Sequence, residues 1–246
     1  MKNKLDVGGT LSQVFSIYGA QAGTLLPIAF WLFLVVAIVN GLISGSLIML
    51  AVALAVSTIV GTLYQGTVVK LVSDVQDGRR DSSAGDLLRS AMPFVLPLIG
   101  AGLLAGIGIG IGMVLLIVPG LILATIWAVI APVIVVEKAG VFHSFRRSHD
   151  LVRGNGLQVF GVIVVAFVIV FVGSLVFGAI AGAVSSGPIV RIVFSAIAST
   201  ITAPISALVA AVLYFRLREF EAAPATTVGD PEAPAPPTVP PAPPAV

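Results

Sequence analysis

Four long stretches without any Asp, Glu, Lys or Arg dominate this chain of 246 residues. They are Val7–Val69, Ser90–Val136, Gly154–Val190 and Ile192–Phe215, with lengths of 63, 47, 37 and 24 residues. A helix needs about 20 apolar residues to cross the hydrocarbon core of a bilayer. The first two stretches are therefore long enough for two crossings each, and the last two hold one crossing each. The pattern predicts six transmembrane helices.

Short turns pair these spans into three hairpins. We expect the second hairpin to turn at Val118–Gly120, because Pro119 removes a backbone donor and Gly120 permits a tight bend. The predicted fold is an all-α polytopic membrane protein, and only 10% of its residues are charged, against about 25% in a soluble domain. The expected spans are residues 25–44, 47–69, 93–113, 121–136, 157–184 and 192–215.

The basic residues predict how the chain is threaded. With six spans, every Lys and Arg except Arg191 falls on one side of the membrane. The positive-inside rule assigns this side to the cytoplasm. We therefore expect the inner membrane of a prokaryotic cell, with both termini cytoplasmic. The basic residues on that side are Lys2, Lys4, Lys70, Arg79, Arg80, Arg89, Lys138, Arg146, Arg147, Arg153, Arg216 and Arg218.

A short amphipathic segment precedes each hairpin, at residues 10–18, 83–92 and 141–152. We expect these segments to be helices at the membrane surface. Thr10 with Gln13, and Ser83 with Asp86, have the spacing of an N-terminal capping box. The unit recurs about every 65 residues, which suggests a threefold internal repeat. Segments next to a membrane are often amphipathic without any repeat, so the repeat is a hypothesis.

Glycines recur every fourth residue in the third span, at Gly102, Gly106 and Gly110. Small residues at this spacing allow two helix backbones to approach closely. We expect these three glycines to pack against another helix at the centre of the bundle, in preference to forming a flexible or pore-lining helix.

The third amphipathic segment carries a basic cluster of Arg146, Arg147 and Arg153. These side chains have the chemistry to bind anionic lipid headgroups. Cations that only set the topology explain them equally well, so both interpretations stay open.

No residues predict catalysis or metal binding. The chain has no cysteine, and His143 and His149 are six residues apart, so they do not share a helix face as a metal pair would. Asp74, Asp77 and Asp81 lack the spacing of a calcium loop. We therefore expect no catalytic residue, no metal and no cofactor, and a net charge of +2 gives no reason to expect nucleic acid as a partner.

The last segment has a different composition. Residues 222–246 are rich in Pro and Ala and have almost no bulky apolar side chains. Such a segment cannot bury a core. We expect a membrane domain at residues 1–221, followed by a disordered cytoplasmic tail.

One block carries a family resemblance. It includes Val118–Leu121, Trp127, Ala131–Val133, Glu137 and Phe145–Asn155. It resembles a broad group of poorly characterised six-span prokaryotic membrane proteins. That group includes the YciC-like proteins and the membrane domain of some glycerophosphoryl diester phosphodiesterases. The resemblance covers roughly Thr10 to Arg218 and implies fold and location. It implies no catalysis, because the phosphodiesterase's catalytic domain has no counterpart in this sequence.

These observations favour a non-catalytic scaffold or accessory protein. The interfacial helices would bind lipid, in particular anionic headgroups, or another membrane protein. Two alternatives remain. A transporter for a neutral or amphiphilic solute would need a cavity lined by Asn40, Gln65 or the glycines of the third span. An enzyme acting on lipid would need polar groups such as Arg146, Asp150 and Asp81 to converge.

Overall fold

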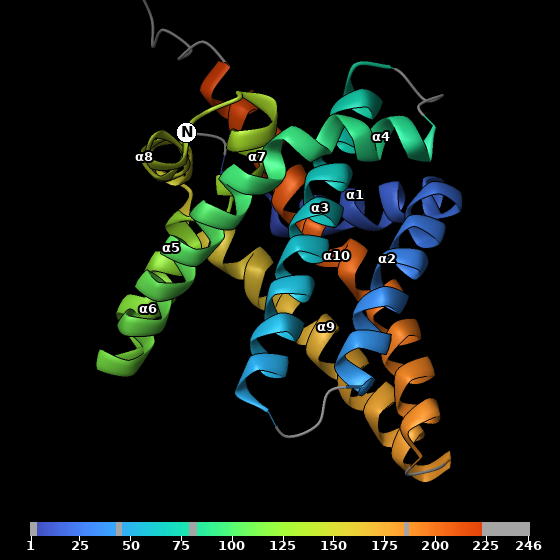
Figure 1. The fold of residues 1–246 in the computed structure, drawn as a ribbon. Helices are drawn as coiled ribbons and strands as arrows, with labels where there is room; N and C mark the ends of the chain where they lie inside the picture. Colours follow the sequence, from blue (N-terminus) through green and yellow to red (C-terminus); the bar gives the residue numbers. More distant parts are fainter. Residues whose placement is uncertain (1–3, 43–45, 79–82, 185–186, 223–246) are drawn as a thin grey trace, which may run out of the picture.

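The computed structural model describes residues 4–42, 46–78, 83–184 and 187–222, and over these residues the chain is helical with no strand (Figure 1). The helices are α1 (Val7–Ala20), α2 (Ala22–Leu42), α3 (Leu47–Gln76), α4 (Ala84–Ala91), the 3₁₀ turn η1 (Met92–Phe94), α5 (Val95–Leu115), α6 (Ile117–Ile126), α7 (Ile130–Val136), α8 (Val141–Val152), α9 (Gly156–Val184) and α10 (Pro188–Ala222).

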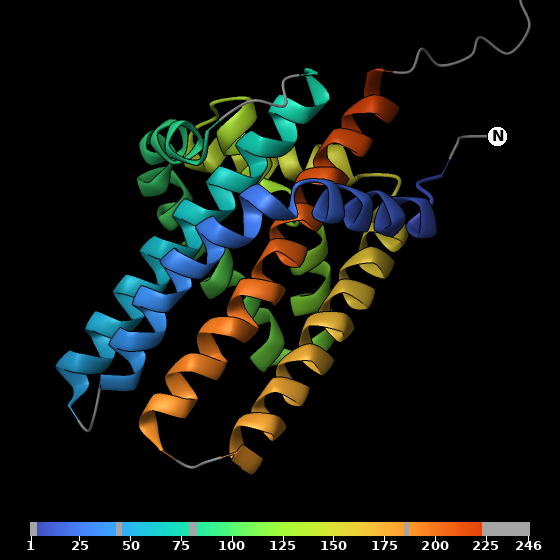
Figure 2. The same ribbon diagram turned by 90° about the vertical axis from the view of Figure 1, so that its right-hand side faces the viewer.

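Six helical segments in the described residues are long and apolar enough to cross a membrane, as predicted. The three expected amphipathic helices are present as α1, α4 and α8, and all three lie at one end of the bundle (Figures 1 and 2). We call this the basic end and the opposite end the far end. The predicted tail at residues 222–246 falls outside the described residues after Ala222.

Helix α10 occupies the centre of the molecule, between α2 and α9 (Figure 2). It also contacts α1, α3, α7 and α8. Toward the basic end its alanines allow neighbouring helices to approach closely, while Leu208, Leu213 and Tyr214 are fully buried. The core therefore lies near the basic end, where these side chains meet Val68 and Ile134.

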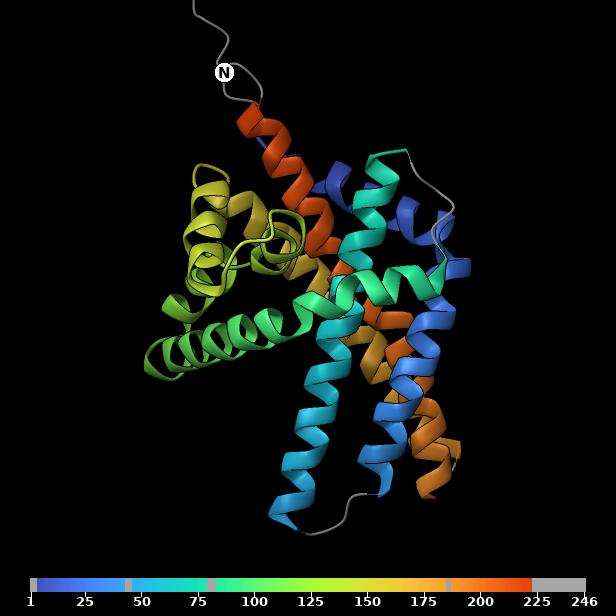
Figure 3. The same cartoon turned by 45° about the horizontal axis from the view of Figure 1, so that its top comes forward.

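The second hairpin leans away from the other long helices (Figure 3). The chain reverses at Leu116, whose backbone is extended, and not at the predicted Val118–Gly120. Pro119 instead lies in the first turn of α6, where its missing N–H costs nothing. The two helices of the hairpin approach closely at Gly112, where a Cβ would lie 2.9 Å from the Gly120 backbone.

The fourth predicted span is broken into two helices. Helix α6 ends at Ile126 and α7 begins at Ile130, with a turn at residues 127–129. This turn contains neither Gly nor Pro, so turn composition did not predict it. The broken backbone needs outside hydrogen-bond partners at this depth, and α8 supplies one of them, as described below.

The structure confirms one predicted helix cap and corrects the other. Ser83 caps α4, because its hydroxyl oxygen accepts from the Asp86 N–H at 3.2 Å. Helix α1 begins earlier than predicted, at Val7, and its cap is Asp6. The Asp6 carboxylate accepts from the N–H groups of Gly8 and Gly9 at 3.0 and 2.9 Å, so Thr10 and Gln13 do not cap this helix.

Candidate functional site

A sharp turn between α7 and α8 begins the candidate site. Helix α7 ends at Val136 with Glu137 as its C-cap, and Lys138 follows with φ of +53°. This left-handed conformation is uncommon for a residue with a side chain. It stops α7 abruptly, so that α8 starts after Gly140 and folds back against α6, α7 and α10.

The inner side of α8 docks onto the α6–α7 break. Phe145 meets Trp127 edge to face, with ring centroids 4.9 Å apart. The fully buried Ser148 donates its hydroxyl hydrogen to the Ile126 carbonyl at 2.8 Å and accepts from the Val129 N–H at 3.4 Å. Ser148 therefore satisfies backbone groups on both sides of the break, which would otherwise be unpaired in an apolar region.

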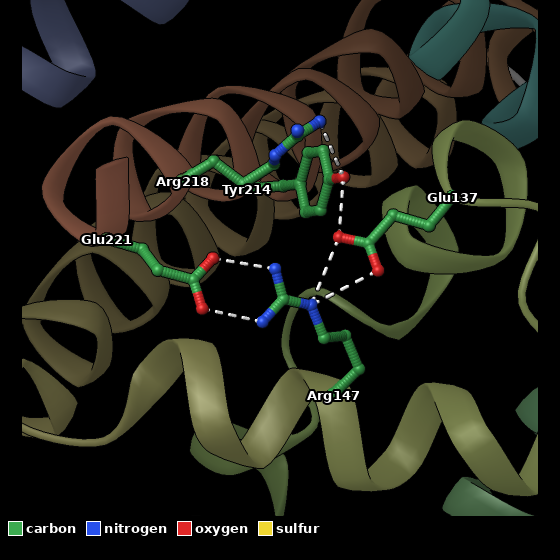
Figure 4. Close-up of polar contacts among 5 residues, drawn as sticks. All are labelled: Glu137, Arg147, Tyr214, Arg218 and Glu221. Atoms are coloured by element: carbon green, nitrogen blue, oxygen red, sulfur yellow. Dashed lines mark hydrogen bonds and ion pairs between the residues drawn. The ribbon is translucent and has the colours of Figure 1, made fainter.

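Arg147 links α8 to α7 and α10 through two carboxylates (Figure 4). Its Nε donates to both oxygens of Glu137 at 3.1 Å. Its Nη1 and Nη2 donate to the two oxygens of Glu221 at 2.7 and 2.6 Å. A guanidinium that binds a carboxylate through two parallel hydrogen bonds is held in both position and orientation. Arg147 therefore fixes α8 against the end of α10.

Two further side chains of α10 complete this network. The Tyr214 hydroxyl donates to Glu137 Oε1 at 2.9 Å and accepts from Arg218 Nη1 at 3.3 Å. The two carboxylates and two guanidiniums balance, so the cluster has no formal net charge. We call these five residues the α8 anchor: Glu137, Arg147, Tyr214, Arg218 and Glu221.

Their ion pair shifts the pKa values of Arg147 and Glu221. Hydrogen bonding to Glu221 raises the pKa of Arg147, against a smaller opposing effect of burial. The hydrogen bond from Arg147 lowers the pKa of the Glu221 carboxyl. Both shifts favour the charged forms. Arg147 and Glu221 therefore keep their charges near neutral pH, which maintains the ion pair between α8 and α10.

The outer side of α8 has a different character. Phe142, Arg146, His149 and Arg153 follow each other at spacings of four, three and four residues, which places them on one stripe. All four are exposed, and Phe142 is 81% exposed. Neither Arg146 nor Arg153 makes a hydrogen bond or ion pair with another described residue. We call this stripe the α8 outer face. It presents two guanidiniums without a partner among the described residues, beside an aromatic ring.

The structure separates the three arginines predicted to act together. Arg146 and Arg153 lie on the α8 outer face, whereas Arg147 turns inward to the α8 anchor. Its guanidinium is shared between Glu137 and Glu221, whereas Arg146 and Arg153 have no partner in the part of the chain that the structure describes.

The three glycines expected to pack against another helix do not contact one among the described residues. Gly102, Gly106 and Gly110 are exposed, and a Cβ on any of them would meet nothing within 4 Å. Close packing within the chain occurs instead at Gly108, where a Cβ would lie 2.7 Å from Trp127, and at Gly112. The predicted stripe therefore does not lie at the centre of this bundle, because α5 turns another side toward its neighbours.

Several residues of the site had no clear signal in the sequence. Glu137 looked like the end of a span, and Tyr214 and Glu221 looked like part of the last helix and its edge. Tyr214 and Glu221 follow Glu137 by at least 77 residues along the chain, so only tertiary packing brings them together. Ser148 lies within the Phe145–Asn155 block that carries the family resemblance, but the turn at residues 127–129 that it contacts was not predicted.

The described residues contain no group of three His, Cys, Asp or Glu side chains placed to hold a metal ion. His149 Nδ1 lies 3.4 Å from Asp150 Oδ1, and both side chains are about half exposed. Asp81, which the lipid-enzyme alternative required, lies outside the described residues. The described part of the site thus consists of an exposed charged stripe and an ion-pair cluster.

A family model with the description "Domain of unknown function (DUF7847)" matches residues 6–217, which is most of the chain. The chain belongs to this family. The DUF7847 match ends within α10 and includes all three interfacial helices and Glu137, Arg147 and Tyr214 of the α8 anchor.

A curated relative supports the membrane assignment. The chain is 37% identical over 93 residues to a UPF0259 membrane protein of Pectobacterium carotovorum subsp. carotovorum (strain PC1). The matched part is 38% of this chain and 37% of the relative, so it spans little more than a third of the relative's length. No solved structure matches the chain. With the six apolar helices, these findings identify a multi-pass membrane protein of an uncharacterised family. They show no link to glycerophosphoryl diester phosphodiesterases.

Proposed function

We propose that this DUF7847 protein is a non-catalytic accessory protein whose α8 outer face binds anionic lipid headgroups. The observation that carries the proposal is the division of α8 into two sides. Arg147 is neutralised inside the α8 anchor, while Arg146 and Arg153 lie exposed without partners among the described residues. Because the inner side of α8 is docked against the bundle, its outer face is held at one height and orientation relative to the membrane surface.

The chemistry of the α8 outer face suits the edge of a bilayer. An interfacial helix typically inserts an aromatic or aliphatic side chain and places Lys or Arg at the level of the phosphates. Phe142 and Arg146 are one helical turn apart and meet this description. Each Lys or Arg near an anionic surface contributes about 1 kcal/mol of attraction.

The proposal includes a location and an orientation. We place the protein in the inner membrane of a prokaryotic cell with the basic end in the cytoplasm. The support is that the described Lys and Arg residues except Arg191 lie on helices or turns of the basic end or on helix ends that reach it. Anionic lipids in the cytoplasmic leaflet would then face α8.

The alternatives expected from the sequence have less support. Asn40 donates to Ser57 at 3.3 Å between α2 and α3, and Gly102, Gly106 and Gly110 face outward. The transport alternative needs a cavity lined by Asn40, Gln65 or these glycines, and the α9–α10 groove described below is lined by none of them. A membrane-protein partner could occupy the α8 outer face in place of lipid, and the experiment below includes this outcome.

Photochemical labelling tests the proposal with the full chain in nanodiscs. The nanodiscs contain phosphatidylcholine and a small fraction of phosphatidylglycerol that carries a diazirine close to its headgroup. We expect labelling of the α8 segment, which the double variant Arg146→Gln/Arg153→Gln reduces roughly tenfold or more. A matched variant, Lys4→Gln/Arg89→Gln, removes the same number of charges from the basic end and should leave α8 labelling unchanged.

Three results would overturn the proposal. Labelling of α8 that is equal for the wild-type chain and the Arg146→Gln/Arg153→Gln variant would show that these cations do not recruit the lipid. Equal labelling by a phosphatidylcholine with the same diazirine would show that headgroup charge is irrelevant. Co-purification of a membrane protein that depends on Arg146 and Arg153, without lipid selectivity, would assign the face to a protein partner instead.

A further inference from the structure

A groove between α9 and α10 lies at the other end of the molecule from α8. Its volume is about 570 Å³, and its lining includes Ser174, Gly178 and Gly182 of α9 with Arg191, Ser195 and Ser199 of α10. The two helices run antiparallel, so Arg191 lies opposite Gly182 near the far end, and Ser199 lies opposite Ser174 deeper in the bundle. Eight residues separate these levels on each helix, a distance of about 12 Å at 1.5 Å per residue.

Polarity changes along this groove. Arg191, at its outer end, is the one basic residue of the whole sequence that the predicted threading places away from the cytoplasmic side. Below it the walls are small or apolar, with Ala181, Phe177 and Phe194 beside the glycines. The Ser174 and Ser195 hydroxyls donate to carbonyls of their own helices, at 2.8 and 3.0 Å. The Ser199 hydroxyl makes no hydrogen bond with another described residue.

The side on which the groove opens identifies the kind of ligand. Ser174, Gly178, Gly182 and Ser195 are exposed, so the open side lies on the surface of two apolar spans. At this depth the surrounding medium is lipid, not water. A ligand must therefore enter from the bilayer. A guanidinium at the outer end complements an anionic headgroup, and the apolar walls below it complement an acyl chain.

We propose that the α9–α10 groove binds one anionic phospholipid of the surrounding bilayer. The headgroup contacts Arg191, one acyl chain lies along Gly178 and Gly182, and the Ser199 hydroxyl is available to an ester oxygen. This site is independent of the α8 outer face, because the two lie at opposite ends of the bundle and share no residue.

The test uses the full chain in nanodiscs with phosphatidylglycerol that carries a diazirine in its acyl chain. We expect labelled residues in 174–182 and 191–199. Gly178→Leu should reduce this labelling about tenfold, because a Cβ at Gly178 meets nothing within 4 Å and the added side chain fills the groove without disturbing the backbone. Arg191→Gln should cause a similar loss, and Arg191→Lys should restore most of the labelling.

Gly102→Leu is the matched control, because Gly102 is also a helical glycine with open space at its Cβ position, and it does not line the groove. It should leave labelling of α9 and α10 unchanged. Wild-type labelling that survives both Gly178→Leu and Arg191→Gln would overturn the proposal, as would equal labelling by a phosphatidylcholine probe. Arg146→Gln/Arg153→Gln reports on α8 alone, so failure of one site leaves the other testable.

Discussion

Lys138 adopts a backbone conformation that most side chains avoid, and this conformation produces the turn into α8. Its φ of +53° lies in the left-handed region, which costs roughly 1 kcal/mol for a residue with a Cβ. The side chain is exposed, so few contacts compensate for this strain. The turn is therefore maintained by what it connects: Glu137 in the α8 anchor and the docked side of α8.

Substituting Lys138 should reveal this strain. We expect Lys138→Gly to raise the free energy of unfolding by up to about 1 kcal/mol, because glycine adopts positive φ without steric cost. Lys138→Val should lower it, since a β-branched residue is least compatible with this region. The measurement is the unfolding midpoint in a titration with sodium dodecyl sulfate. Equal midpoints for the two variants would contradict the assignment of strain.

Ser148 and Ser144 allow the capping of the α6–α7 break to be measured. Both are fully buried on α8, but the Ser144 hydroxyl donates to Val141 of its own helix, whereas Ser148 contacts Ile126 and Val129 across the break. We expect Ser148→Ala to cost about 1–3 kcal/mol, because buried backbone groups lose their partner. Ser144→Ala should cost much less. A larger loss for Ser144→Ala would show that the break is stabilised in another way.

Helix α8 behaves as a separate part that is attached at defined points. Its inner side contacts the α6–α7 break through Phe145 and Ser148, and Arg147 holds it to the end of α10. The amphipathic pattern was sufficient to predict this helix and its bounds. The pattern could not assign Arg147 to the docked side, because Arg146, Arg147 and Arg153 have the same chemistry and only the packing of α10 distinguishes them.

A double-mutant cycle on Arg147 and Glu221 should measure the attachment. The two side chains are 23% and 50% exposed, so solvent screens their interaction. We expect a coupling free energy of about 1 kcal/mol between Arg147→Gln and Glu221→Gln. Arg146→Gln, one position away, should show no coupling to Glu221→Gln. Unfolding midpoints of the single and double variants supply the measurement, and additive effects would contradict the attachment.

The distribution of Lys and Arg predicts how the whole bundle is oriented in the membrane, and labelling can test this orientation. The chain contains no cysteine, so single cysteines can be introduced without background. We expect Lys138→Cys in intact cells to react with a membrane-impermeant maleimide only after permeabilisation. Leu47→Cys at the far end, where the side chain is 85% exposed, should react from outside. The reverse pattern would invert the proposed threading.

Much of the bundle could be read from stretches that lack charged residues, because the bilayer excludes charge strongly. The six spans were predicted on this basis, and the three interfacial helices were predicted from their amphipathic pattern. The break at Trp127–Val129 and the outward direction of Gly102, Gly106 and Gly110 were not. Both depend on which side of a uniformly apolar helix meets its neighbours. Apolar helices carry little periodic signal to indicate that side.

The central position of α10 has a consequence for how the protein is made. Helix α10, on which α1, α2 and α9 pack, is synthesised after the other five spans have left the ribosome. Until then, the surfaces that later surround Leu208 and Leu213 have only lipid or the insertion machinery to cover them. We therefore expect the contacts around these side chains to form only after α10 has been inserted. A premature stop codon before α10 should yield a product that quality-control proteases remove.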